Sequence, residues 1–197
     1  MGASATARDL LRLARLLLRA NFAARPRVPA LAPGRATVRV MTYNVNYEMP
    51  SPARTVEAIR TSGCDVVCLQ ETTPAWERLL RGELTEAYPH MVFAGGEEDA
   101  GGLAALSRRP LQQTAWIAPP AEGTLPAAVV AADTPLGTLH VLHVHLTSPS
   151  IDADAVRSFL GTLRLREGEI RAFWPHMPAD GPGVVLGDFN EGDWGFA

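Results

Sequence analysis

The 197-residue sequence contains no lysine, so all 18 of its basic side chains are arginine. Cysteine is also scarce, with only Cys64 and Cys68, both in an apolar stretch. Their spacing does not form a CxxC motif, which disfavours a metal or redox site, and we expect both to be small core residues in a reducing compartment. Together with abundant Ala, Gly and Pro, the missing lysine indicates a GC-rich genome and a bacterial source.

Long apolar runs are absent as well. No window holds 18 uncharged apolar residues, so we expect no membrane-spanning helix. Apolar residues make up 47% of the chain and charged residues 20%, which is typical of a folded globular protein. Residues 1–39 contain eight Arg and one Asp, whereas residues 40–197 contain ten Arg and twenty Asp or Glu. A body so acidic disfavours general nucleic-acid binding.

The basic tail has its own pattern. Four arginines recur at helical spacing among leucines: Arg8, Arg12, Arg15 and Arg19. This spacing predicts an amphipathic helix that could lie on an anionic membrane surface. The simpler interpretation, which we favour, is a helix packed on the domain or a loosely ordered extension. We predict this helix and a Pro-rich linker over residues 1–35, and a domain over 36–197. The expected location is the cytoplasm, and residues 8–19 are the candidate segment for a peripheral membrane contact.

The body begins with two strand–helix units and continues with short strands. The expected strands cover residues 37–47, 64–71, 90–96, 101–109, 113–118, 127–134, 137–147 and 183–190. The expected helices cover residues 51–63, 73–87 and 152–177. A β-α-β opening, a strand-rich middle and a late helix–strand unit favour two packed sheets with helices outside.

Polar residues stand where several of these strands end: Asn44, Glu71, His145, Asp188 and Asn190. In layered α/β structures, functional residues gather at the carboxyl ends of strands. Carboxylates and carboxamides are the hard oxygen ligands that Mg²⁺ prefers, and such an ion can neutralise a phosphate. Taken singly, Glu71 could be a helix cap or a salt-bridge partner, and the GDFN segment a turn. Their combination favours a site.

The histidines of the strand at 137–147 allow a second interpretation. His143 and His145 share one face of the strand, and such a pair can ligate zinc. The HxHxDH pattern of metallo-hydrolases would require an Asp where Thr147 stands, so a zinc site is disfavoured. We expect His140 and His143 to be structural or partly exposed, and His145, which ends the strand, to be functional.

Five stretches, in this order, resemble the endonuclease/exonuclease/phosphatase family: VMTYNVNYE, DVVCLQET, GGLAALSRRP, LHVHLTSP and VVLGDFNEGD. The resemblance implies an α/β fold, a deoxyribonuclease-I-like, four-layered sandwich of two mixed sheets with outer helices, and phosphoester hydrolysis that depends on Mg²⁺ or Mn²⁺. It implies metal ligation by Asn44, Glu71, Asp188 and Asn190. It also implies a catalytic His145 at the phosphate, with Asp188 and Asn190 positioning the nucleophilic water.

Family members continue beyond GDFN to a strand bearing an Asp and then to a Ser-Asp-His motif, and neither follows Asn190. We therefore expect a truncated, incomplete site and an unpaired sheet edge. One interpretation is a phosphodiesterase, phosphatase or nuclease, with the acidic body favouring a small, nucleotide or lipid phosphoester over duplex DNA. The alternative is a catalytically impaired remnant or binding module. Nucleic-acid binding by the tail is disfavoured, because aromatic residues do not alternate with its arginines.

Overall fold

The computed structural model describes residue 11 and residues 34–49, 51–96, 100–120, 124–148 and 155–191, with the backbone alone over 155–161. Most of the tail expected over residues 1–35 lies outside these ranges. Its helix, its linker and its membrane contact therefore stay predictions. Within the described ranges, no helix combines the length and apolar character needed to cross a membrane.

The first sheet is mixed and has the strand order β1-β2-β4-β3. Its strands are β1 (Val40–Asn44), β2 (Val66–Gln70), β3 (His90–Ala94) and β4 (Leu103–Ser107). β1 and β2 are parallel, and the other neighbours are antiparallel. Every residue of the two central strands, β2 and β4, is buried. This burial on both faces explains why β2 is a continuous apolar run rather than an alternating one.

The second sheet has the order β5-β6-β7-β8. Its strands are β5 (Leu111–Ile117), β6 (Ala127–Thr134), β7 (Gly137–His145) and β8 (Gly183–Asp188). The first three form an antiparallel meander, and β8 runs parallel to β7. In the described part of the chain, β8 is therefore an edge strand.

Three α-helices complete the described fold: α2 (Ala53–Thr61), α3 (Pro74–Leu84) and α4 (Ala155–Phe173). Thr73 caps α3, because its hydroxyl accepts a hydrogen bond from the backbone N–H of Trp76. The long helix expected over residues 152–177 ends earlier, where α4 gives way to a short 3₁₀ helix, Trp174–His176. Pro175 explains this ending, since it has no N–H for the next helical hydrogen bond.

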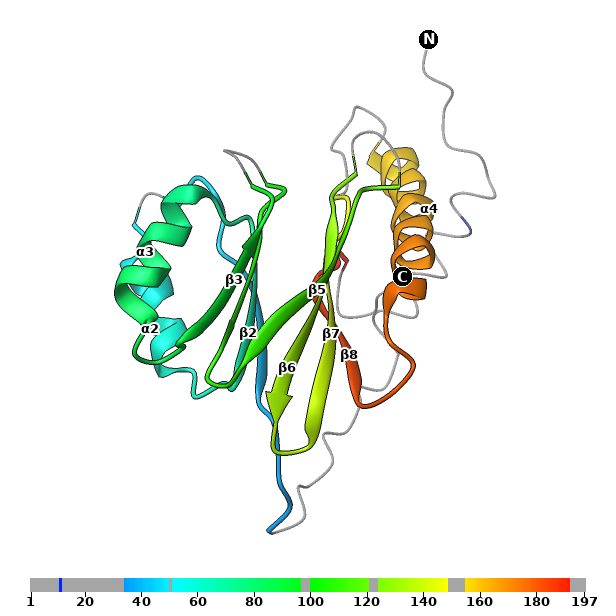
Figure 1. Ribbon diagram of the computed structural model, residues 1–197. Coiled ribbons are helices and arrows are strands. Elements are labelled where there is room, and N and C mark those ends of the chain that lie inside the picture. The colour runs from blue at the N-terminus through cyan, green and yellow to red at the C-terminus, as the bar shows by residue number, and fades with distance from the viewer. Residues whose placement is uncertain are drawn as a thin grey trace.

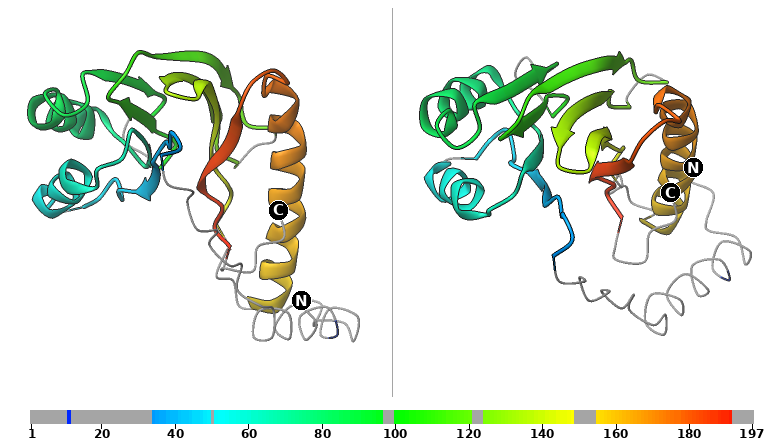
Figure 2. Two further views of the ribbon diagram at one scale, coloured as in Figure 1. Left: turned by 90° about the horizontal axis from the view of Figure 1, so that it is seen from below. Right: turned by 60° about the horizontal axis from the view of Figure 1, so that its bottom comes forward.

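The two sheets pack face to face around a layer of small apolar side chains: Val66, Cys68, Ala105, Val130, Ala132 and Val141. The opposite face of the first sheet packs with α2 and α3, and that of the second with α4. Figure 1 shows these helices on the two outer sides of the sheets. In Figure 2 the same layers are seen from below. The arrangement is helix, sheet, sheet, helix, which confirms the four-layered α/β sandwich.

Cys68 belongs to the layer between the sheets and is completely buried. Burial raises the pKa of its thiol to about 12, because the charged thiolate is disfavoured away from water. Neither Cys68 nor the half-buried Cys64 forms a disulfide. The Cys68 thiol therefore stays protonated and packs as a small apolar group, as its sequence context predicts.

Gly187 lets β8 approach β7 closely. A Cβ atom at this position would lie 1.8 Å from the carbonyl oxygen of Val144, its partner in the β7–β8 ladder. A backbone oxygen in a paired strand cannot move aside as the end of a flexible side chain can. The next pair in the same register is His145 and Asp188, so this close approach also sets the relative position of two candidate site residues.

We predict that Gly187→Ala lowers the free energy of unfolding by about 1–3 kcal/mol or more, as overpacking of a rigid interior does. The control is Gly82→Ala in α3, where an added methyl group meets no atom within 4 Å. That substitution should stabilise the protein by about 0.5–1 kcal/mol through helix propensity. Urea unfolding measures both changes. Equal stability of the wild type and Gly187→Ala would contradict the close approach.

Candidate functional site

The candidate residues come together where β1, β2, β7 and β8 end. Asn44 ends β1, and Glu71 follows β2 in the first sheet. His145 ends β7, and Asp188 ends β8 in the second sheet. β1 and β8 lie against each other although they stand at opposite ends of the described domain. The structure thus joins four of the five predicted side chains across the two sheets.

Asn44 links the two carboxylates. Its side-chain nitrogen donates to Oε1 of Glu71 at 2.7 Å and to Oδ2 of Asp188 at 3.0 Å. Its oxygen accepts from the backbone N–H of Asn46, which determines the orientation of the amide. The –NH₂ group thus faces the carboxylates and holds Glu71 and Asp188 close together. The metal ligation expected of Asn44 stays a prediction.

Glu71 is held by its backbone as well as by Asn44. Its φ angle of 62° lies in the left-handed region, which costs a non-glycine residue about 1–3 kcal/mol and is characteristic of functional sites. Its Oε2 accepts a hydrogen bond of 3.3 Å from the backbone N–H of Tyr47. The nearby helix α3 is capped by Thr73, so the role of Glu71 is not that of a helix cap.

His145 presents one ring nitrogen to both carboxylates. Its Nδ1 lies 3.2 Å from the carbonyl oxygen of Ala100. A carbonyl oxygen only accepts, so Nδ1 carries the hydrogen of this bond. Nε2 lies 3.9 Å from Oε1 of Glu71 and 4.0 Å from Oδ2 of Asp188. Nε2 is therefore the atom that can take up or release a proton in the site.

Asn190 orients Asp188. The backbone N–H of Asn190 donates to Oδ1 of Asp188 at 2.8 Å, which leaves Oδ2 directed toward Asn44 and His145. The Asn190 side-chain nitrogen donates to the carbonyl oxygen of Leu146 at 2.7 Å. Its φ angle of 50° is one that Asn tolerates well. In GDFN, Gly187 and Asp188 thus end β8, and Asn190 lies two residues beyond the strand. The direct metal and water contacts expected for Asn190 stay predictions.

The donor set suits a hard divalent cation. One oxygen each of Glu71 and Asp188 turns toward a common space lined by His145. In the described ranges, no three His, Cys, Asp or Glu side chains group as a metal site. Mg²⁺ is commonly held by only one or two carboxylates, with water and substrate phosphate completing its shell. Two convergent carboxylates fit that pattern better than a closed zinc site.

Gln70 and His143 form a polar pair that sequence reasoning missed. His143 is buried between the sheets, and its Nε2 accepts a hydrogen bond of 2.6 Å from the Gln70 amide. Gln70 also donates to the Thr42 hydroxyl at 3.1 Å. The available signal was a polar residue at the end of an otherwise apolar β2. Burial, with a smaller contribution from the charge of His145, lowers the pKa of His143 to about 3. His143 is therefore neutral and structural, as expected.

We predict that stability falls as the pH drops from about 6.5 toward 3. An unfolded chain protonates His143 near pH 6.5, whereas the folded chain does not until about pH 3. Within this window the unfolded state binds more protons, so stability rises with pH by up to about 1.4 kcal/mol per unit. Urea unfolding over this pH range should show a smaller slope for His143→Leu and an unchanged slope for exposed His176→Gln. Equal slopes for wild type and His143→Leu would contradict the buried neutral state.

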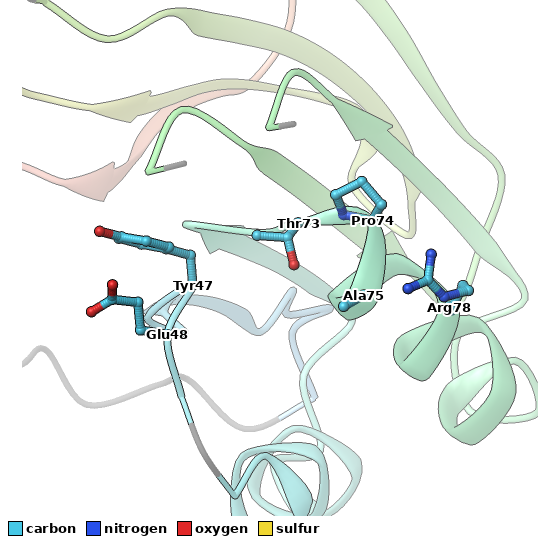
Figure 3. Close-up of a pocket in the computed structure, with 6 residues that line it drawn as sticks. All are labelled: Tyr47, Glu48, Thr73, Pro74, Ala75 and Arg78. Carbon is cyan, nitrogen blue, oxygen red and sulfur yellow. The ribbon is translucent and has the colours of Figure 1, made fainter. Parts of the chain in front are cut away.

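An open pocket of about 420 Å³ lies between the segment that follows β1 and the start of α3. Its lining is Tyr47, Glu48, Thr73, Pro74, Ala75 and Arg78. Figure 3 shows Tyr47 and Glu48 on one side and Arg78 on the other, with the first turn of α3 between them. Tyr47 is 39% exposed, and Arg78 makes no ion pair or hydrogen bond among the described residues. A partly exposed aromatic ring and a cation with no partner in the described part of the chain thus line this pocket.

The two-sheet sandwich carries a polar cluster at its strand ends, and a comparison of the sequence with protein-family models identifies the family. Residues 41–196 match the Endonuclease/Exonuclease/phosphatase family, and the chain belongs to it. A comparison with curated protein sequences found no significant match.

Several solved structures share the fold. A humanized D. rerio TDP2 has a TM-score of 0.61 at 16% identity, over 79% of this chain and 67% of that one. D. rerio TDP2 complexed with a single-strand DNA product has a TM-score of 0.58 at 18% identity, over 79% and 62%. An AP endonuclease from Archaeoglobus fulgidus has a TM-score of 0.53 at 18% identity, over 78% and 58%. The matched region thus spans two thirds or less of these three chains, and the likeness shows the fold.

Proposed function

We propose that this chain hydrolyses phosphoester bonds with a divalent metal ion, Mg²⁺ or Mn²⁺. The observation that carries the proposal is the convergence of Glu71 and Asp188 on the Asn44 amide, with Nε2 of His145 within 4.0 Å of both carboxylates. Like charges approach so closely only where a donor or a cation offsets their repulsion. Family membership supports the same class of reaction.

Each residue has a role in this proposal. Glu71 and Asp188 would hold the metal, which when bound neutralises phosphate charge and favours ionisation of water. Asn44 keeps the two carboxylates together through its –NH₂ group. His145 would hold a proton at Nε2 or donate it to an oxygen of the ester. Asp188, oriented by Asn190, positions the water whose oxygen bonds to phosphorus as the ester P–O bond breaks.

We predict that Glu71→Gln lowers kcat/KM for bis(p-nitrophenyl) phosphate by about 10²-fold or more, because it removes a charge that metal and phosphate require. The matched control is Glu86→Gln, because Glu86 is an exposed carboxylate just after the end of α3. EDTA should abolish turnover, and added Mn²⁺ should restore it. Full activity of Glu71→Gln would contradict the proposed site. A wild-type chain without turnover in Mg²⁺ or Mn²⁺ would favour the impaired or binding-module alternative.

We further propose that the substrate is a nucleic acid strand. D. rerio TDP2, which shares the fold, has been solved with a single-strand DNA product. Tyr47 offers a ring on which a base flanking the cleaved phosphate could stack, and Arg78 offers a charge for a neighbouring phosphate. Glu48 disfavours a phosphate at its own end of the pocket. The comparisons do not support the preference for a small phosphoester that the acidic body suggests.

We predict that Tyr47→Ala and Arg78→Ala each raise KM for a single-stranded oligonucleotide roughly 5-fold or more, equivalent to about 1 kcal/mol of lost stacking or phosphate contact. KM for bis(p-nitrophenyl) phosphate, which is too small to reach the pocket, should not change. Arg164→Ala is the control, since Arg164 is exposed on α4 in the opposite outer layer. Equal effects on both substrates would contradict a flanking subsite.

A further inference from the structure

Three charged side chains lie buried beside the candidate site, between α4 and the segments that follow β7 and β8. Arg166 has no exposed surface, Glu169 is 1% exposed, and the Glu191 side chain is 3% exposed. Charged residues are seldom buried so completely unless they are paired. Arg166 meets this condition through an ion pair of 3.0 Å between its Nε and Oε1 of Glu191.

Two of these residues bind every polar group of Thr147. Nη1 of Arg166 donates to the Thr147 carbonyl oxygen at 3.1 Å. The Glu169 carboxylate accepts from the Thr147 backbone N–H at 3.1 Å and from its hydroxyl at 2.7 Å. Thr147 stands two residues after His145. The segment that leaves the site histidine is therefore attached to α4 by three hydrogen bonds.

The segment after β8 is attached in the same way. Glu191, which Arg166 holds, directly follows Asn190. The two segments are also joined to each other through Leu146, whose N–H donates to the Asp188 carbonyl oxygen at 2.8 Å. The Leu146 carbonyl oxygen accepts from the Asn190 side chain at 2.7 Å. Arg166 and Glu169 thus hold both ends of a hydrogen-bonded unit that carries His145 and Asp188.

We propose that Arg166 and Glu169 are positioning residues of the site. They fix the segments that follow β7 and β8, and thereby set Nε2 of His145 against the Asp188 carboxylate. The catalytic part of this inference rests on the proposed function, whereas its geometric part does not.

The energetics of the cluster favour positioning over stability. Nη2 of Arg166 is buried without a hydrogen-bond partner among the described residues. Leaving a buried donor unsatisfied costs about 1–3 kcal/mol. Buried ion pairs are also often no more stabilising than apolar side chains of similar volume. An apolar cluster would fill this space at least as stably, but it would provide no hydrogen bonds to Thr147.

Glu169→Gln and Glu169→Met form a matched pair that tests the inference. The Gln carboxamide can still accept from the Thr147 N–H and can donate to its hydroxyl, whereas Met fills similar space without either bond. We expect the Gln variant to keep wild-type kcat within about 2-fold. The Met variant should lose about 10- to 10²-fold in kcat with KM nearly unchanged, the cost of misplaced catalytic groups. The imidazole NMR signal of His145, assigned by its loss in His145→Gln, should shift in the Met variant alone.

Thr147→Val and Thr147→Ser provide a milder pair if Glu169→Met does not fold. Val keeps the shape of Thr147 but deletes the hydroxyl bond to Glu169, and Ser keeps that bond. We expect the His145 signal to shift in the Val variant and to stay in place in the Ser variant. A folded Glu169→Met or Thr147→Val protein with wild-type His145 signal and kcat would overturn the inference. The NMR comparison decides it even if the wild-type chain hydrolyses no phosphoester, an outcome that counts against the proposed function alone.

Discussion

The hydrogen bonds from the Asn44 amide to carboxylates of both sheets are the interaction on which the candidate site depends. Two carboxylates held close together repel each other, and an amide –NH₂ group offsets part of this repulsion without adding charge. Because Glu71 and Asp188 belong to different sheets, the same contact also joins the two halves of the sandwich at its polar end. A metal and a phosphate would therefore meet an arrangement that exists before they bind.

Backbone features support this arrangement. Glu71 adopts a left-handed conformation that is unfavourable for its residue type, and the close β7–β8 pairing requires a residue without a side chain at Gly187. Neither feature is the most stable local solution. Each of them helps to position a carboxylate of the site. The buried charges of Arg166 and Glu169 are likewise unfavourable locally and hold segments that carry site residues. Locally unfavourable features thus lie around the site, whereas the apolar layer between the sheets is regular.

The strand ends could be predicted from the sequence because each is marked locally, by an apolar run that stops at a polar residue. Asn44, Glu71, His145 and Asp188 were found by this rule, and the layered fold followed from the order of elements. Other features depend on partners distant in sequence. Gln70 meets His143 across 73 positions, and the orientation of the Asn44 amide depends on a backbone N–H in the following loop. Nothing in the local sequence around Arg166 distinguishes it from a solvent-facing arginine of a helix.

Each sheet of the sandwich comes from one continuous part of the chain. Residues 40–107 supply all strands of the first sheet, and residues 111–188 supply those of the second. The strand pairing of the described residues therefore lies within each half. Side chains join the halves, for example the His145 ring, whose Nδ1 bonds the Ala100 carbonyl oxygen. The carboxylates, the amide and the imidazole come from both halves, so they come together only when the halves dock. Any catalytic activity of the chain would therefore appear only after the two halves have docked.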